Sequence, residues 1–160
     1  MSPSRVGFGF DVHSFVDNDS TGRRLVLGGV EFPADVPLVG HSDADVIAHA
    51  IGDALLGAAG LGDLGMHFPE TDPAWQGADS INILRGCLDL VEAAGFHLVN
   101  ADCTVICERP KIAPRREEMI EVLTRAVGAP VHVKATRPEG LGSLGRVEGI
   151  ACMAVVLVET

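Results

Sequence analysis

Three side chains near the start of the chain are of the types that bind a divalent cation. Asp11 and His13 are two residues apart in a segment that reads as a strand, so both side chains should leave the same face. In a predicted helix further on, His49 falls with Asp45 and Asp53 on the side opposite the centre of the apolar stripe. Two imidazoles and one carboxylate, with a fourth position open, are typical of a catalytic zinc site. The spacing alone also allows plain surface residues, or a His49 that only pairs with Asp45 or Asp53.

A second group of residues has the properties of an anion site. His41 and Ser42 stand at the start of the same predicted helix, where free backbone N–H groups and the helix dipole favour a phosphate. Ser42 could equally be no more than a helix cap. Residues 140–149 (GLGSLGRVEG) combine closely spaced glycines with one arginine, which alone is weak evidence for phosphate binding.

Two loop-like segments could contact other parts of a ligand. Residues 61–73 (LGDLGMHFPETDP) are rich in glycines and carboxylates. Residues 109–114 (RPKIAP) contain prolines that fix a shape able to present backbone groups to a base. Either segment could also be an ordinary surface loop. The chain has only two lysines, Lys111 and Lys134, and both lie in or beside these suspected binding segments.

Apolar periodicity predicts the elements that would position these residues. A polar turn around residues 17–20 should separate the first two strands. Ser42 should cap the first helix, with Asp45 completing a capping box, and Gly95 and Gly128 should end the later helices. The second helix should bury Ala94 among its apolar residues. Strands are predicted at residues 5–13, 25–32, 101–107, 131–135 and 150–158, and helices at residues 42–58, 80–94 and 114–127.

Strands and helices are mixed without strict alternation, which predicts one domain over residues 1–160 of the α/β (α+β) class. We expect a mixed β-sheet with helices packed on one face. Residues 150–158 are apolar on both faces, so this strand should be central or covered by a neighbouring subunit. The other face of the sheet is therefore expected to be buried in an oligomer.

Composition and charge argue against some classes of binding partner for this protein. The net charge of −10 argues against a nucleic-acid surface, and no apolar stretch approaches the length of about 20 residues that spans a bilayer. The first residues do not read as a signal peptide, which favours a cytoplasmic protein with its four cysteines reduced and buried. An acidic protein that binds an anion needs local positive potential, from metal ions, helix N-termini or a few cations.

Taken together, the motifs resemble those of the 2-C-methyl-D-erythritol 2,4-cyclodiphosphate synthases, enzymes of the non-mevalonate isoprenoid pathway. The resemblance implies a homotrimer with active sites between subunits. It implies that the 2-phosphate of 4-diphosphocytidyl-2-C-methyl-D-erythritol 2-phosphate attacks the β-phosphorus, so that a cyclic diphosphate forms and CMP leaves. The matching stretches run nearly end to end: GFDVHSF, LVGHSDADVIAHAIGDALLGAAGLGDLG, HFPETDPAWQGADS, ICERPKIAP, and VKAT with GLGSLGRVEGIA.

The resemblance also implies roles for individual residues. Asp11, His13 and His49 match zinc ligands, and Glu139 matches a residue that holds magnesium or manganese. His41 with Ser42 matches a phosphate-contacting pair, Asp63 with Gly65 the ribose contacts, residues 68–72 the erythritol contacts, and residues 107–113 the cytosine pocket. Arg146 and Glu148 match residues near the trimer axis, where a cavity can take an isoprenoid diphosphate. The expected substrate contacts are Asp11, Val12, His13, His41, Ser42, Asp63, Leu64, Gly65, Phe68, Pro69, Glu70, Thr71, Asp72, Cys107, Pro110, Lys111, Ile112, Ala113, Thr136, Arg137, Pro138, Glu139, Ser143 and Arg146.

One departure from the family pattern concerns catalysis. Where the family usually has consecutive threonines, this chain has Thr136, Arg137 and Pro138. The expected catalytic residues are His41, Thr136 and Arg137, with Arg137 serving the diphosphate as a permanent cation. The rival interpretation is that Arg137 points to solvent. Ser143 and Leu144 also replace a more usual phenylalanine–threonine pair, which affects the lining of the axial cavity.

Two other functions remain compatible with the residues. A metal-dependent phosphohydrolase would use the same ion to activate water. A non-catalytic trimer could bind isoprenoid diphosphates or nucleotides without turning them over. Product analysis separates the first from a synthase, and nucleotide affinity that does not depend on zinc would favour the second.

Overall fold

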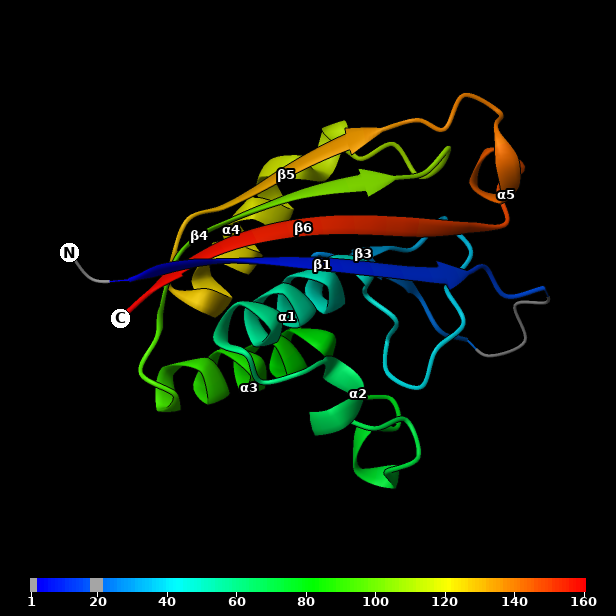
Figure 1. Ribbon diagram of the computed structural model, residues 1–160. Helices are drawn as coiled ribbons and strands as arrows, with labels where there is room; N and C mark the ends of the chain where they lie inside the picture. Colours follow the sequence, from blue (N-terminus) through cyan, green and yellow to red (C-terminus); the bar gives the residue numbers. More distant parts are fainter. Residues whose placement is uncertain (1–2, 18–21) are drawn as a thin grey trace.

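The computed structural model describes residues 3–17 and 22–160. Its main element is a four-stranded mixed sheet with helices on one face (Figure 1). The strand order is β1-β6-β4-β5; β6 is antiparallel to both neighbours, and β4 and β5 are parallel. The α+β class is confirmed, and residues 18–20 of the turn predicted at residues 17–20 lie outside the described residues. The strands are β1 (Ser4–Ser14), β4 (His97–Ile106), β5 (Val131–Thr136) and β6 (Gly149–Glu159). The main helices are α1 (Val46–Ala59), α3 (Ser80–Ala93) and α4 (Arg116–Val127).

The predicted strand at residues 25–32 is instead a hairpin of two short strands, β2 (Leu25–Leu27) and β3 (Val30–Phe32). Gly28 and Gly29 form its two-residue turn with φ values of 58° and 73°. A turn with positive φ at both central positions strongly favours glycine, and it matches the twist of the flanking strands. The prediction of one continuous strand was wrong because it overlooked this glycine pair.

The first long helix begins later than predicted. Its N-cap is Asp45, whose carboxylate accepts hydrogen bonds from the N–H groups of Ile47 and Ala48, and Ala44 has a φ of 59° that breaks the helical path. The same carboxylate accepts the N–H groups of Gly28 and Gly29 at 2.9 and 2.7 Å. Ser42 is therefore not the cap. Residues 41–44 form a loop that leads into α1.

The remaining boundaries follow the predictions with small shifts. The second long helix, α3, begins at Ser80 as predicted and is capped by Asp79, but Ala94, predicted to face inward, is exposed. The third helix begins at Arg116, after a 3₁₀ turn at Ala113–Arg115, and Gly128 ends it. The glycine-rich connection contains the short helix α2 (Leu64–His67) and leads into a 3₁₀ turn at Pro73–Trp75, while residues 142–145 form α5 (Gly142–Gly145).

Two glycines bring α1 unusually close to β1. A Cβ atom built on Gly7 or Gly9 would lie only 1.9 Å from a carbonyl oxygen of α1, that of Ala54 or Ala50 respectively. A strand without side chains at these positions therefore lets the helix backbone approach directly. These two contacts bring the backbone of α1 against the middle of β1.

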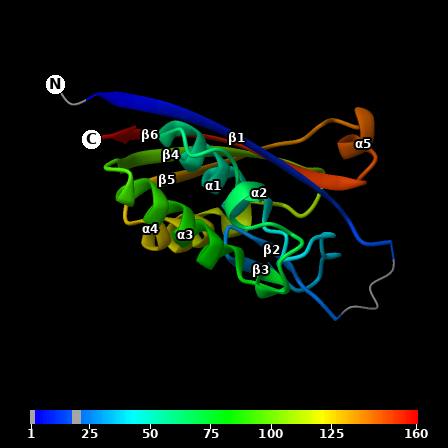
Figure 2. The ribbon, with the colours of Figure 1, turned by 60° about the horizontal axis from the view of Figure 1, so that its bottom comes forward.

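The opposite face of the sheet carries apolar side chains that this chain leaves exposed. β6 is central in the sheet, which was one of the two expectations for it, yet its outward side chains Met153 and Val155 are exposed. The long helices α1, α3 and α4 pack on the other side of the sheet (Figure 2). The four cysteines are buried free thiols. Within the described ranges, no helix combines the length and hydropathy that crossing a bilayer requires. The outward apolar residues, 42–68% exposed, are Val6, Phe8, Phe10, Val12, Met153 and Val155.

Candidate active site

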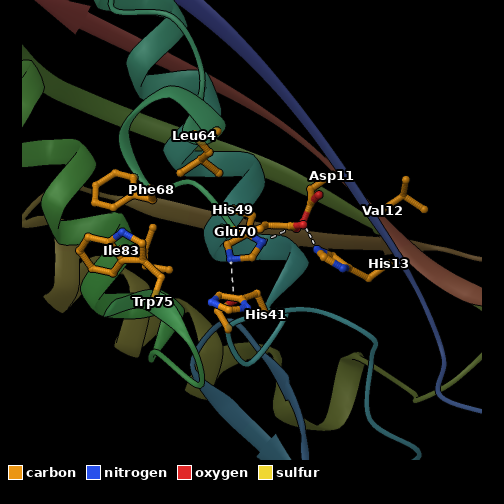
Figure 3. Close-up of a pocket in the computed structure, with 12 residues that line it drawn as sticks. Asp11, Val12, His13, His41, His49, Leu64, Phe68, Glu70, Trp75 and Ile83 are labelled. Carbon is orange, nitrogen blue, oxygen red and sulfur yellow. Dashed lines mark hydrogen bonds and ion pairs between the residues drawn. The ribbon is translucent and has the colours of Figure 1, made fainter. Parts of the chain in front are cut away.

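The three predicted metal ligands meet at one point between β1 and α1 (Figure 3). Asp11 Oδ2 lies 3.1 Å from His13 Nε2 and 3.1 Å from His49 Nδ1. The three ligand atoms all lie within 4.8 Å of one another, and each side chain is half-buried. Among the described residues, this is the one group of three or more His, Cys, Asp or Glu side chains with such geometry.

Each histidine ring is held by a hydrogen bond on the side away from Asp11. His13 Nδ1 lies 2.6 Å from the carbonyl oxygen of Val39, and His49 Nε2 lies 2.9 Å from Ser80 Oγ. A metal-binding histidine usually donates its other ring N–H to such an acceptor, which fixes the ring and its tautomer. One carboxylate and two oriented imidazole nitrogens therefore suit a divalent cation, and the donor set is that of a zinc site with an open position.

In the metal-free chain, Asp11 and His13 shift each other's pKa in opposite directions. Burial alone would raise the pKa of the Asp11 carboxyl, but hydrogen bonds from His13 and His49 outweigh it and hold that pKa well below its usual value. Burial would lower the pKa of His13, yet its hydrogen bond to Asp11 and the carboxylate's charge raise it above 6.5. His13 therefore keeps its proton to higher pH than a free imidazole, and a cation that binds there competes with that proton.

A pocket of about 350 Å³ opens beside the three ligands. Trp75 and Ile83 form part of its wall, and Trp75 meets Phe68 edge-on with ring centroids 5.0 Å apart. None of the lining residues is a lysine or an arginine, so an anion here would depend on a bound cation for charge neutralisation. Sequence reasoning missed Trp75 and Ile83, because apolar residues of this kind read as core. The lining residues predicted from the sequence are Asp11, Val12, His13, His41, Ser42, His49, Leu64, Gly65, Phe68 and Glu70.

The other predicted residues of the 63–72 segment lie around this pocket without lining it. Asp63 caps α2, with its carboxylate accepting the N–H of Met66 at 3.0 Å, and it lines a neighbouring pocket with Asp53. The carbonyl oxygen of Asp72 lies 3.3 Å from His41 Nε2 and restrains that ring. Pro69 and Thr71 belong to the same loop but are not part of the pocket wall.

A second group of predicted residues gathers at the ends of β4 and β5. Because these strands are parallel, the segments that follow them emerge at the same edge. The N–H of Cys107 donates to the carbonyl oxygen of Thr136, and the N–H of Gly140 donates to Glu108 at 2.8 Å. Within the sheet, β6 lies between β1 and the β4–β5 pair (Figure 1). The residues concerned, none of which lines the metal pocket, are Cys107, Pro110, Lys111, Ile112, Ala113, Thr136, Arg137, Pro138 and Glu139.

Comparison with known proteins identifies the family. A model of the YgbB family matches residues 4–159. The chain belongs to the YgbB family. The resemblance inferred from the motifs is confirmed, since relatives in this family carry the name 2-C-methyl-D-erythritol 2,4-cyclodiphosphate synthase.

Individual members of the family match this chain over nearly its whole length. The synthase of Syntrophobacter fumaroxidans is 53% identical over 98% of this chain and 98% of that protein. A bifunctional enzyme IspD/IspF of an Anaeromyxobacter species is 57% identical over 98% of this chain, which spans only 40% of that protein's length. The IspF structure of Plasmodium falciparum, solved as a CDP complex, superposes with a TM-score of 0.83 at 31% identity, covering 99% of this chain and 97% of that one.

Arg137, one of the three expected catalytic residues, forms an ion pair with Glu108. Arg137 Nε donates to Glu108 Oε2 at 2.9 Å, although 67% of the arginine side chain is exposed. This pair and the Gly140 hydrogen bond hold the pKa of Glu108 below its usual value. Arg137 therefore pairs with Glu108 while most of its side chain is exposed to solvent. Of the residues expected near a trimer axis, Arg146 pairs with Glu148 at 2.6 Å, and Ser143 lies exposed in α5.

Proposed function

We propose that this chain converts 4-diphosphocytidyl-2-C-methyl-D-erythritol 2-phosphate into 2-C-methyl-D-erythritol 2,4-cyclodiphosphate and releases CMP. The observation that carries this proposal is the convergence of Asp11, His13 and His49 beside a pocket in a YgbB-family chain. Near-complete mutual coverage with the Syntrophobacter fumaroxidans synthase supports the same reaction.

Zinc is the cation proposed for the Asp11–His13–His49 site, because imidazole and carboxylate ligands with an open position suit it. When bound there, zinc would supply Lewis acidity to a phosphoryl oxygen and neutralise part of its charge. The carboxylates of Asp11 and Glu70 both face the pocket, so without a cation they would repel a diphosphate.

The chain's own residues align the substrate and need not react with it. Phosphoryl transfer depends chiefly on positioning and charge stabilisation. An oxygen of the 2-phosphate forms a bond to the β-phosphorus while the bond from that phosphorus to the CMP oxygen breaks, and CMP keeps the electron pair. His41 and Ser42 are proposed to contact phosphate oxygens, Asp63 and Gly65 the ribose, and the wall around Phe68 the erythritol carbons.

A complete site is proposed to need a neighbouring subunit. The metal pocket and the β4–β5 edge are two separate groups on one chain, and the outer sheet face exposes apolar side chains that an interface would bury. We propose a homotrimer in which residues 107–113 of one subunit complete the metal pocket of another, with the cytosine bound there. The CDP complex of the Plasmodium falciparum relative supports a cytidine nucleotide as ligand.

The same assembly would give roles to the remaining residues. Glu139 would hold magnesium or manganese against the diphosphate, and Thr136 with Arg137 would stabilise charge on the transferred phosphoryl group. Arg146 would lie near the trimer axis and favour an anionic occupant such as an isoprenoid diphosphate.

Phosphorus NMR of the purified protein with the cytidine substrate tests the proposal. The expected products are a cyclic diphosphate and CMP, formed with metal present and not formed after chelation. Free inorganic phosphate would identify a phosphohydrolase instead. Nucleotide binding without turnover, equally tight with and without zinc, would identify a non-catalytic binding protein.

A further inference from the structure

A buried hydrogen-bond relay lies behind His49, on the side of the ring that faces away from the proposed cation. Ser80, the first residue of α3, is fully buried, and its Oγ lies 2.9 Å from His49 Nε2. The same hydroxyl contacts Asp43 Oδ1. Asp43 is fixed in turn, because its carboxylate accepts the N–H of Ser80 at 3.2 Å and that of Asp45 at 3.3 Å.

The chemistry of these groups gives the relay a direction. An ionised carboxylate can only accept, so the Ser80 hydroxyl must donate its one hydrogen to Asp43. The serine oxygen is then left as an acceptor toward His49, which must donate from Nε2. With the proton on Nε2, a neutral ring carries its lone pair on Nδ1, the atom that lies 3.1 Å from Asp11.

We propose that Ser80 and Asp43 are positioning residues that hold His49 in the tautomer able to bind a cation through Nδ1. This inference rests on the proposed metal site at Asp11, His13 and His49. In the opposite tautomer, an N–H at Nδ1 would donate to Asp11 and exclude the cation. The hydrogen bonds from His49 to Ser80 and from Ser80 to Asp43 therefore disfavour the tautomer in which His49 Nδ1–H donates to Asp11 in the metal-free chain.

Replacing either relay residue should affect the tautomer in a different way. Ser80→Ala removes the nearer acceptor and leaves the Nε2 proton of His49 only the longer contact to Ser42 Oγ, at 3.3 Å instead of 2.9 Å. Asp43→Asn keeps the shape but forces an amide NH₂ against one of the donors that the carboxylate now accepts. Hydrogen bonds behind metal-binding histidines are typically worth about 10–100-fold in metal affinity.

The test measures zinc affinity by chelator competition and records the His49 Nε2–H signal in the zinc-loaded protein by ¹⁵N NMR. Ser80→Ala should lose about 10–100-fold in zinc affinity, and its Nε2–H signal should exchange rapidly with water. Asp43→Asn should lose affinity by a smaller factor and keep a protected signal. If Ser80→Ala does not fold, Asp43→Asn alone decides, and unchanged affinity in that variant overturns the proposal.

Asp79→Ala is the matched control, because Asp79 caps the same end of α3 without touching His49. It should lower stability and leave zinc affinity unchanged. Wild-type zinc affinity in Ser80→Ala, or an equal loss in Asp79→Ala, would overturn the relay. A wild-type protein that binds no zinc would instead refute the metal site itself, so the two failures are distinguishable.

Discussion

Replacing Gly9 by alanine tests whether close packing of α1 on β1 sets the metal site. The added Cβ would lie 1.9 Å from the Ala50 carbonyl oxygen, whereas ordinary contact begins at 3.4 Å, so the two backbones must separate by about 1.5 Å. Both contacting atoms belong to rigid elements, and overpacking of this kind costs about 1–3 kcal/mol or more. We expect a loss of about 3 kcal/mol in the free energy of unfolding.

The same displacement should separate the metal ligands. Asp11 follows Gly9 by two residues and His49 precedes Ala50 by one, so moving the helix opens the 3.1 Å contact between their side chains. Zinc affinity should then fall by more than tenfold. Gly7→Ala meets an equal clash, 1.9 Å from the Ala54 carbonyl oxygen, but further from the ligands. It should cost similar stability and less zinc affinity.

Urea denaturation of the metal-free protein and chelator competition measure the two effects separately. Gly57→Ala serves as the control, because its Cβ would meet nothing within 4 Å in the last turn of α1. Alanine there should stabilise the protein by up to about 1 kcal/mol through helix propensity. Wild-type stability and zinc affinity in Gly9→Ala would refute the claim that this packing positions the ligands.

Three further changes probe other parts of the site. Because the pKa of His13 is raised, a cation must displace a proton from this ring. Zinc affinity should therefore fall about tenfold per pH unit below that pKa, and the loss should begin above pH 6.5. Equal zinc affinity at about pH 8 and about pH 5.5 would contradict this. Asp45→Ala should lower the free energy of unfolding by about 3 kcal/mol, because it leaves backbone N–H groups of α1 and of the β2–β3 hairpin without an acceptor. A urea midpoint unchanged from wild type would show that these hydrogen bonds do not stabilise the protein. Arg137→Ala should reduce turnover more than tenfold in steady-state assays and leave zinc affinity unchanged. Wild-type turnover in this variant would show that Arg137 has no role in catalysis.

The candidate residues of the proposed metal site could be predicted from the sequence because the face that each side chain takes depends on local geometry. Two residues of a strand share a face whenever they are two apart, and the position of His49 on its helix follows from helical periodicity. The convergence of strand and helix came from the family resemblance rather than from spacing. This convergence depends on the close contact between the glycines of β1 and the backbone of α1, and that contact can be identified only once the fold is known.

Features that depend on long-range contacts were missed or misplaced. Ser80 touches His49 across 31 positions of sequence, and in the sequence it reads only as the start of a helix. The start of α1 was misplaced because Ala44 adopts a positive φ, which an alanine gives no sign of, and because Asp45 binds the distant Gly28–Gly29 turn. The adjacency of residues 107–113 and 136–140 follows from parallel pairing of β4 and β5, which periodicity does not reveal.

Anomalous diffraction at the zinc edge from crystals grown with zinc tests the central claim most directly. We expect one anomalous peak at about 2.0–2.2 Å from a carboxylate oxygen of Asp11, from His13 Nε2 and from His49 Nδ1. A peak held by other residues, or three side chains that stay apart with no metal between them, would contradict the account.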